Sequence, residues 1–519
     1  MADARAVFLK RISVILAGIA VFAALALMPA PEGMTAEAQR MLAVAALMAV
    51  WWIGEGVPIA VAALLPLALF PILGIMPSKE TAPHYANHLI FLFLGGFMIA
   101  LAMEKWNFHK RLALTIISVI GNSLGHIVLG FMVATAFISM WISNTATAMM
   151  MLPVAMAVVR QVASQGSLHG KRDPETEKTI LYGLGPVLML AIAYSASIGG
   201  IGTLIGTPPN IVFAGFYKKL FPGNPEITFL QWMVLAMPIV VALLPVAWVY
   251  LCRFVSTIPL DKIEFGDKDS DIIRKELTAL GPMSRAEKFI AVAFASAAFL
   301  WIFREPLPIG WLTVPGWSSL FPHPAFLHDA TVAMFVGTLL MVVPLDIDEG
   351  VEHKGKKEHF VLDWETVESG VPWGVLLLFG GGFALAAGIE KTGLDHWIGR
   401  QLAGAGHLPL PAIMLIVCLA VAALTEVTSN TATATMILPI MGSLAEGIGV
   451  HPLYLMVPAA LSSSFAFMLP VSTPPNAIVF ASGWLTVPRM AKAGLALNLI
   501  GAFLIAGAVY AIVGAVFLG

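Results

Sequence analysis

The sequence predicts an all-α polytopic membrane protein with about eleven transmembrane helices and two re-entrant hairpins, arranged as inverted repeats. Three observations predict this class. Of the 519 residues, 59% are hydrophobic and only 12% are charged, whereas soluble domains are about 45–50% apolar and about 25% charged. Apolar runs of roughly 17–25 residues, long enough to span a bilayer, recur along the chain. The string Ser-Asn-Thr-Ala-Thr-Ala occurs twice, at 143–148 and 429–434.

The apolar runs give the spans in chain order. The first run follows Arg5, Lys10 and Arg11, a pattern that also begins signal peptides, but the run is long for one and no soluble domain follows it. Two further stretches, 112–160 and 407–444, hold the repeated string and are interpreted as re-entrant hairpins. The eleven spans are expected at 12–29, 40–54, 57–76, 88–103, 180–217, 229–252, 289–303, 330–345, 373–389, 453–484 and 493–518.

An internal repeat relates two units of the chain. Matching strings lie 286 residues apart at three places: Gly-Gly-Phe at 95 and 381, Glu-Lys at 104 and 390, and Ser-Asn-Thr at 143 and 429. Thr-Pro-Pro-Asn at 207 and 473 is 266 residues apart. A polar insert at 161–179, present only in the first unit, accounts for the difference. The two homologous units are therefore about 88–217 and 373–484.

The positive charges predict the orientation of the spans. Lysine and arginine gather at 5–11, 105–111, 160–178, 253–288 and 354–357. If both hairpins return to the face that they left, all five clusters lie on one face, which the positive-inside rule makes the cytoplasm. The N-terminus is then cytoplasmic and the C-terminus lies outside. The two units cross the membrane in opposite directions, as in many secondary transporters.

The Thr-Pro-Pro-Asn strings predict a break in two spans. Threonine is a good N-cap, and proline is accepted at the first position of a helix. Span 180–217 is therefore expected to break near Gly206, with a half-helix from Thr207, and span 453–484 is expected to break near Ser472. A proline kink, or helix packing through small residues, would explain one copy of each motif but not two matching copies. Interrupted spans at matching positions point to the binding site of a transporter.

Helix ends in the middle of the membrane suit charged ligands. N-termini present free N–H groups to an anion, and C-terminal carbonyls with Asn or Ser oxygens suit a hard cation such as Na⁺. Neither motif contains Lys or Arg. Bound cations are therefore expected to supply the counter-charge for an anion.

The motifs resemble those of the divalent anion–sodium symporter family, which includes Na⁺/dicarboxylate, Na⁺/citrate and Na⁺/sulfate cotransporters. The matching strings are Met140–Thr147, Gly206–Asn210, Thr425–Thr431 and Thr473–Phe480, and the resemblance extends from about 40 to 485. It implies a homodimer in the bacterial inner (cell) membrane that works by an elevator motion.

The resemblance also implies a division into two domains. The scaffold would comprise 1–111 and 256–400, the latter with a cytoplasmic connector, and the transport domain would comprise 112–255 and 401–519. The charged patches 104–111 and 390–400 would be interfacial arm helices between them. Ordinary charged ends of spans explain the composition of these patches equally well.

Carried over by position, the resemblance implies two sodium sites and one anion site. The first sodium site would use Ser139, Ser143, Asn144 and the Gly206 carbonyl. The second would use Thr425, Ser429, Asn430 and backbone near Ser472. Substrate carboxylates would meet Asn144, Thr145, Asn430 and Thr431, with Thr207 and Thr473 nearby. Because Ser472 stands where the first unit has Gly206, the two sodium sites are expected to differ in detail.

Glu426 adjoins the second motif, and its counterpart in the first unit is Met140. A carboxylate at membrane depth is a functional hypothesis by default, so a proton or ion role competes with a hydrogen-bonded structural role. Cys252 and Cys418 lie in apolar spans without metal-binding spacing and are interpreted as core residues.

The leading function is sodium-coupled symport of a di- or tricarboxylate, with a C4-dicarboxylate such as succinate as the expected substrate. The alternatives on the same fold are a sodium-independent dicarboxylate exchanger, and sulfate or citrate as substrate. An intramembrane enzyme would need a constellation such as His-Glu-x-x-His, which does not occur. A channel would use filter rings rather than broken helices in repeats. A net charge of −2 gives no basic surface for nucleic acid.

Overall fold

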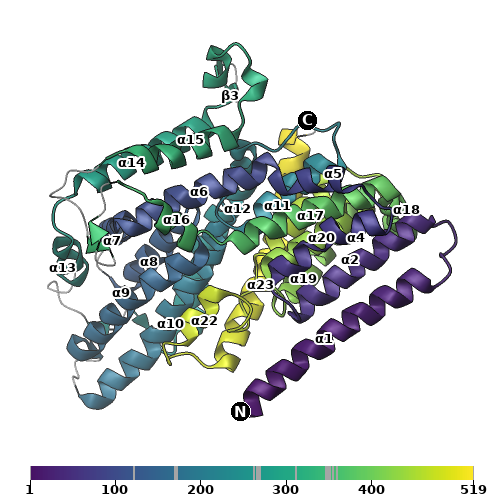
Figure 1. The fold of residues 1–519 in the computed structure, drawn as a ribbon. Helices are drawn as coiled ribbons and strands as arrows, with labels where there is room; N and C mark the ends of the chain where they lie inside the picture. The colour runs from purple at the N-terminus through teal and green to yellow at the C-terminus, as the bar shows by residue number, and fades with distance from the viewer. Residues whose placement is uncertain are drawn as a thin grey trace.

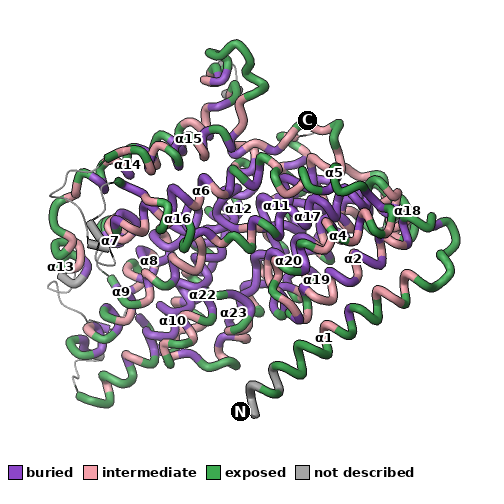
Figure 2. The backbone as a smooth tube through the Cα atoms, viewed as in Figure 1, coloured by how far each residue is buried: buried purple, intermediate pink, exposed green. Residues whose placement is uncertain are grey.

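The computed structural model is almost entirely helical, with long helices lying side by side and short links joining them (Figure 1). It describes residues 2–120, 123–168, 173–260, 263–264, 271–309, 312–344, 352–353, 356–357 and 360–517. Parts of the charged segment 260–288 and of the polar loop 346–371 lie outside these residues. Buried positions are concentrated where the central helices meet (Figure 2).

The N-terminal part forms five helices: α1 (Ala2–Leu27), α2 (Ala36–Gly54), α3 (Ile59–Ala63), α4 (Leu65–Ile72) and α5 (Ser78–Thr81). Thr35 caps α2, since its side chain accepts a hydrogen bond from the amide of Ala38. Helix α1 packs against α2 and is otherwise almost entirely exposed at the edge of the bundle (Figure 2). An apolar helix so exposed is suited to lipid or to another protein rather than to water.

The same run of seven helices then occurs twice. The first run is α6 (His88–Lys105), α7 (Phe108–Ile120), α8 (Leu124–Ser139), α9 (Asn144–Gln165), α10 (Pro174–Gly200), α11 (Pro208–Leu220) and α12 (Phe229–Tyr250). The second run is α17 (Trp373–Thr392), α18 (Leu394–Leu402), α19 (Leu410–Thr425), α20 (Asn430–Gly447), α21 (Leu453–Ser462), α22 (Pro474–Phe480) and α23 (Val487–Ile512). Within the described residues, the repeat thus extends one helix beyond each unit that the sequence indicates.

A middle segment joins the two runs. Its helices are α13 (Asp271–Ala279), α14 (Arg285–Ile302), α15 (Asp329–Val342) and α16 (Trp364–Gly370). Among the described residues, three two-stranded antiparallel ladders occur. In these, β1 (Ser167–Leu168) pairs with β2 (Ile263–Glu264), β3 (Leu307–Ile309) with β4 (Leu312–Val314), and β5 (Glu352–His353) with β6 (Lys356–Lys357). The β3–β4 hairpin projects from the bundle near α15 (Figure 1).

Each of the eleven expected spans coincides with at least one helix. Within the described residues, eight helices are long and apolar enough to cross a membrane, and five apolar segments are shorter. Span 57–76 is divided between α3 and α4, while 180–217 and 453–484 are each interrupted as expected. The number of crossings and the inverted orientation of the units stay predictions.

The first hairpin lies later in the chain than the expected 112–160. Residues up to 120 belong to α7, which follows Asn107, a residue with the positive φ of 56°. Ser123 then caps α8, because its side chain accepts from the amide of His126. The hairpin therefore runs from α8 to the end of α9, over 124–165. The apolar run hid this boundary, because α7 also carries apolar residues that pack against α8.

Most described residues of the polar insert 161–179 are helical. Helix α9 continues to Gln165, and α10 begins at Pro174. Asp173 caps α10 by accepting from the amide of Thr176, and proline occupies the first helical position. Residues 169–172 of the expected insert lie outside the described residues. The extra length of the first unit therefore goes largely into a longer α9 and α10.

Equivalent lysines of the two units form equivalent ion pairs. Lys105 Nζ, in the last turn of α6, lies 2.7 Å from Asp363 Oδ2 at the start of α16. Lys391, in the last turn of α17, pairs with Glu80 of α5. Burial raises the pKa of Asp363, but hydrogen bonds from Lys105 and Thr366 outweigh it and lower the pKa to about 2. Each lysine therefore connects its unit to the segment before the other unit.

Candidate functional site

The first hairpin brings three oxygen atoms together at its turn. Helix α8 ends at Ser139 and α9 begins at Asn144, so the turn contains the end of one helix and the start of the next. Ser139 Oγ lies 2.6 Å from Asn144 Oδ1 and 2.8 Å from the carbonyl oxygen of Ala196 in α10. One hydroxyl hydrogen can serve only one of these acceptors. The other of these two close O···O contacts therefore has no hydrogen between its oxygens. A bound cation would offset the repulsion between their lone pairs.

The second hairpin repeats this arrangement. Thr425 Oγ1 lies 2.7 Å from Asn430 Oδ1 and 2.7 Å from the carbonyl oxygen of Ser463. Thr425 and Asn430 are the repeat counterparts of Ser139 and Asn144, and both hydroxyl-bearing residues are fully buried. The structure thus forms a hydroxyl–amide–carbonyl cluster in each unit. Each cluster brings three oxygens together, and oxygen is the ligand that hard cations prefer.

The breaks in the two long spans are longer than expected. Helix α10 already ends at Gly200, and α11 begins at Pro208, with Thr207 as its N-cap. Helix α21 ends at Ser462 and α22 begins at Pro474. The expected positions, Gly206 and Ser472, therefore lie near the end of each unwound segment rather than at its start. Both segments leave backbone groups free of helical bonds.

An asparagine in each Thr-Pro-Pro-Asn motif holds the unwound segment together. Asn210 Nδ2 donates to the carbonyl of Thr203 at 2.6 Å and to that of Gly200 at 3.1 Å. Asn476 Nδ2 donates to the carbonyl oxygens of Ala466 and Leu469 at 2.9 and 3.0 Å. Both asparagines are fully buried, and no partner is found for their Oδ1 atoms in the described structure. Each amide therefore fixes the loop and leaves one acceptor for a ligand.

Gly200 and Gly206 leave room beside the oxygens of the first cluster, because neither carries a side chain. A Cβ atom on Gly200 would lie 2.5 Å from Asn144 Oδ1, and one on Gly206 would lie 2.4 Å from the Gly200 carbonyl oxygen. Real Cβ contacts essentially never come closer than 3.0 Å. Gly206 therefore lies beside the predicted first sodium site, together with the carbonyl of Met140, which is 3.0 Å from the same Cβ position.

Substitution of Gly200 by alanine is expected to displace the Asn144 side chain and weaken sodium binding. Loss of one charge-assisted contact, worth about 1.5–3 kcal/mol, corresponds to about a tenfold or greater rise in the sodium concentration for half-maximal uptake. The measurement is sodium-dependent uptake into proteoliposomes. Gly507→Ala, on α23, is the matched control, because its Cβ would meet nothing within 4 Å. Equal sodium dependence in both variants would contradict this placement.

Of the four helices that begin at the repeated motifs, two have no side-chain cap at their N-termini. Thr207 of α11 and Ser429 of α20 make no capping hydrogen bond, whereas Ser143 and Thr473 cap α9 and α22 through Ala146 and Asn476. Helix α11 packs against α20, and α22 packs against α9. Each half-helix thus lies against the hairpin of the other unit. Uncapped N–H groups on adjacent helices are suited to an anion.

The remaining predicted residues differ in burial. Ser143, Asn144, Thr145, Ser429 and Asn430 are half-buried. Thr207, Thr431, Ser472 and Thr473 are buried. Ser472 Oγ lies 2.6 Å from the carbonyl oxygen of Leu469, inside the unwound segment. In the described part of the chain, no hydrogen bond joins a predicted residue of the first unit to one of the second.

Glu426 is a fully bonded buried carboxylate. Oε1 accepts from the amide of Met468 at 2.9 Å and from Asn498 Nδ2 at 2.7 Å, and Oε2 accepts from the amide of Leu469 at 3.1 Å. The carboxylate therefore fastens the second unwound segment to the hairpin and to α23. These contacts favour the structural interpretation of Glu426 over a proton or ion role.

The asparagines of the Thr-Pro-Pro-Asn motifs, Asn210 and Asn476, were not among the predicted site residues. Asn210 and Asn476 each donate to two or more carbonyls within the unwound segments. Their recurrence at matching positions was the signal that could have identified them. Asn498 and Thr203, whose Oγ1 donates to the Met140 carbonyl, carry no such signal, because neither belongs to a repeated string.

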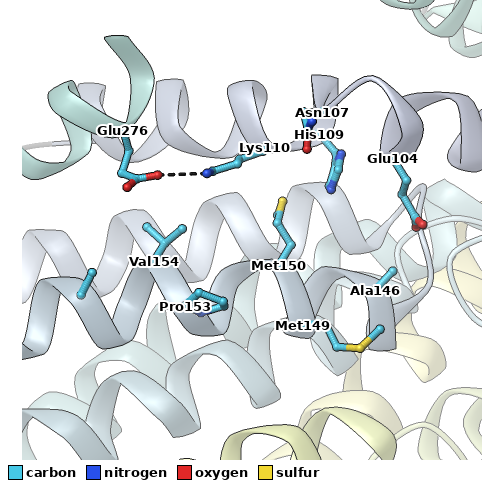
Figure 3. Close-up of a pocket in the computed structure, with 11 residues that line it drawn as sticks. Glu104, Asn107, His109, Lys110, Ala146, Met149, Met150, Pro153, Val154 and Glu276 are labelled. Atoms are coloured by element: carbon cyan, nitrogen blue, oxygen red, sulfur yellow. Dashed lines mark hydrogen bonds and ion pairs between the residues drawn. The ribbon is translucent and has the colours of Figure 1, made fainter. Parts of the chain in front are cut away.

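A cavity of about 570 Å³ lies beside the first hairpin (Figure 3). Glu104, Asn107 and Lys110 line one side, on the α6–α7 segment, and residues of α9 from Ala146 to Ala157 line the other. The Lys110–Glu276 ion pair, with 2.9 Å between Nζ and Oε2, lies at the cavity. The cavity thus reaches the first turn of α9, next to Asn144.

These features define a polytopic membrane protein whose duplicated broken helices surround oxygen clusters suited to small ions. A family profile for the transmembrane region of sodium:sulfate symporters matches residues 9–516, and the chain belongs to this family. The expected divalent anion–sodium symporter family is thereby confirmed, and with it Na⁺ as the family's coupling ion. The family consists of transporters, and this chain is an integral membrane protein.

Relatives of known function cover most of the chain. The sodium-dependent dicarboxylate transporter SdcS of Staphylococcus saprophyticus is 42% identical over 484 residues, 93% of this chain and 88% of the relative. SdcS of Staphylococcus aureus strain RF122 is also 42% identical, over 92% of this chain and 87% of the relative.

Two solved structures share the fold. The YdaH transporter of Alcanivorax borkumensis has a TM-score of 0.52 at 12% identity, over 87% of this chain and 89% of that one. MtrF of Neisseria gonorrhoeae has a TM-score of 0.53 at 11% identity, over 97% and 94%. At these identities the likeness concerns the fold alone.

Proposed function

We propose that this protein is a sodium-coupled symporter of di- or tricarboxylates, with a C4-dicarboxylate such as succinate as its substrate. The duplicated hydroxyl–amide–carbonyl cluster at Ser139–Asn144 and Thr425–Asn430 is the observation that carries the proposal. The names of the relatives, sodium-dependent dicarboxylate transporters, support the substrate class. The bacterial inner membrane, with a cytoplasmic N-terminus and an external C-terminus, is the proposed location.

One sodium ion binds at each cluster. In the first, Ser139, Asn144 and carbonyl oxygens near Gly206 provide the ligands, and Ser143 acts mainly as the cap of α9. In the second, Thr425 and Asn430 act with the backbone near Ser472. The carbonyl ends of α8 and α10 add the negative ends of two helix dipoles at the first cluster.

The anion binds between the two hairpins, with bound sodium as its counter-charge. Thr145 and Thr431 follow the two asparagines in the first turns of α9 and α20. Thr207 and Thr473 begin the half-helices that pack against the opposite hairpins. The uncapped N-termini of α11 and α20 support this placement, because an anion can accept from their free N–H groups.

Transport proceeds by an elevator motion in a homodimer. The moving part comprises 112–255 and 401–519, and the scaffold comprises 1–111 and 256–400. In this proposal α7, which begins at Phe108, is the arm that connects the two parts. Lys110 and Glu276 line the cavity beside α9, and both lie on the proposed cytoplasmic side. This conformation is therefore interpreted as inward-facing.

Uptake of labelled succinate into proteoliposomes tests the proposal. We expect uptake with an inward Na⁺ gradient and none when K⁺ replaces Na⁺. Succinate uptake without Na⁺ that needs dicarboxylate inside the vesicles would instead establish a sodium-independent exchanger. Sodium-dependent uptake of sulfate or citrate, with succinate neither transported nor competing, would overturn the substrate assignment.

A further inference from the structure

Two histidines and a glutamate from three distant segments meet outside the ion clusters. His88 is the first residue of α6, Glu226 lies in the link between α11 and α12, and His328 caps α15. Glu226 Oε2 lies 2.9 Å from His328 Nε2 and 3.8 Å from His88 Nε2, and the two imidazole rings are 4.1 Å apart. All three residues are half-buried, and one ligand atom from each lies within 4.8 Å of the others.

We propose that His88, Glu226 and His328 bind a divalent transition-metal ion of the Zn²⁺ class. Zinc in open sites takes three protein ligands, including the combination of two histidines and one glutamate, and keeps a fourth position for water. With bonds of about 2.0–2.1 Å in a tetrahedron, ligand atoms lie roughly 3.3 Å apart. The observed separations of 2.9 and 3.8 Å bracket this value. Small side-chain movements therefore complete the site.

Glu226 supplies the negative charge of the cluster. The hydrogen bond from His328 holds the pKa of Glu226 below its usual value, although burial opposes the shift, so the ligand is a carboxylate at neutral pH. Asp329, adjacent to His328, is neutralised by Arg304, whose Nε lies 2.6 Å from Oδ1. The positive charge of Lys218, on α11, also lowers the pKa of Glu226. Two neutral imidazoles and one carboxylate would then be the ligands of the divalent metal ion.

Metal binding displaces one proton within the cluster. The amide of Ala330 points at His328 Nδ1 over 3.3 Å, so the neutral ring carries its hydrogen on Nε2, facing Glu226. A metal bound to Nε2 requires that position to be deprotonated. The ring hydrogen then lies on Nδ1, so Nδ1 no longer accepts the 3.3 Å hydrogen bond from the amide of Ala330.

The cluster joins parts that the elevator motion must separate. His88 and His328 belong to α6 and α15, which pack side by side in the proposed scaffold, whereas Glu226 belongs to the proposed transport domain (Figure 1). The cavity beside α9 lies at the opposite end of α6, near Glu104. A bound metal would therefore hold the outer end of the protein closed in this inward-facing conformation. This consequence, unlike the binding itself, rests on the proposed function.

Zinc binding to the purified protein in nanodiscs, measured by calorimetry with ZnCl₂, tests the site. We expect one equivalent to bind, and affinity to fall more than about tenfold in His88→Gln and in His328→Asn, since even outer-shell changes at metal sites cost 10–100-fold. Asparagine at 328 retains an oxygen that can cap α15. Thermal unfolding without zinc checks that both variants are folded. Unchanged affinity in folded variants would overturn the proposal.

Two controls define the location of the metal. His323→Asn changes an exposed histidine a few residues before His328 and is expected to leave binding unchanged. His396→Gln disrupts the other His/carboxylate group of the described residues, Asp395, His396 and Glu446, two of which are exposed. Loss of binding in His396→Gln, with binding retained in His88→Gln, would place the metal there and overturn the assignment.

Zinc outside proteoliposomes tests the conformational consequence separately. We expect it to inhibit sodium-driven uptake in the wild type and not in His88→Gln. Zinc that binds at this cluster without slowing uptake would overturn the closure of the outer end. If no anion is taken up under any condition, the proposed function fails, while the calorimetric result still decides the metal site.

Discussion

Alanine in place of Asn144 or of Asn430 is expected to nearly abolish sodium-driven uptake while the protein stays folded and dimeric. Each amide oxygen lies within 2.7 Å of a buried hydroxyl at the turn of its hairpin. Removal of that oxygen deletes a predicted cation ligand and a predicted contact to the anion. Contacts to charged groups contribute about 1.5–3 kcal/mol, so loss of one corresponds to about 10- to 150-fold weaker binding.

Sodium titrations of uptake, with gel filtration and thermal unfolding of each variant, measure this effect. Gln401→Ala is a suitable control, because it also removes an amide side chain, from an exposed position on α18. Wild-type uptake in both asparagine variants would show that the hairpin turns are not the ion sites. A loss in only one variant would mean that the two clusters are not both used.

The repeat made most of the architecture predictable. Lipid requires backbone groups to be satisfied within each segment, so apolar length and breaks carry strong information. The matching strings at 143 and 429, and at 207 and 473, identified the hairpins and broken spans that the structure contains. The 2.6 and 2.7 Å contacts of Ser139 and Thr425 with their asparagines give the two predicted cation sites the same local geometry.

Element boundaries were less predictable, because composition does not record where a helix changes direction. The apolar run from 112 onward gives no sign that α7 ends at Ile120 and that a new helix begins at Leu124. Helix α21 ends at Ser462, ten residues before the expected Ser472. Within the unwound segment, the amides of Met468 and Leu469 donate to the Glu426 carboxylate instead of to helical carbonyls. Such bonds involve residues that are distant in sequence and show no local pattern.

Glutamine in place of Glu426 is expected to loosen the second unwound segment and weaken sodium binding at the second cluster. The carboxylate accepts from two backbone amides and from Asn498, whereas a glutamine amide offers one oxygen and one donor group. The side-chain amide of Asn498 can flip so that its oxygen faces the glutamine, because this Oδ1 has no partner in the described structure. The backbone amides of Met468 and Leu469 cannot turn, so one of them loses its acceptor.

An unsatisfied buried amide costs about 1–3 kcal/mol, so Glu426→Gln is expected to lower the unfolding temperature and to raise the sodium concentration for half-maximal uptake. Glu446→Gln, at an exposed carboxylate later in α20, should change neither quantity. A proton or ion carrier at position 426 predicts a different outcome: unchanged thermal stability with a lost pH or sodium dependence of uptake. Because a structural carboxylate alters stability and a carrier alters coupling alone, the paired measurements separate the two roles that the sequence left open.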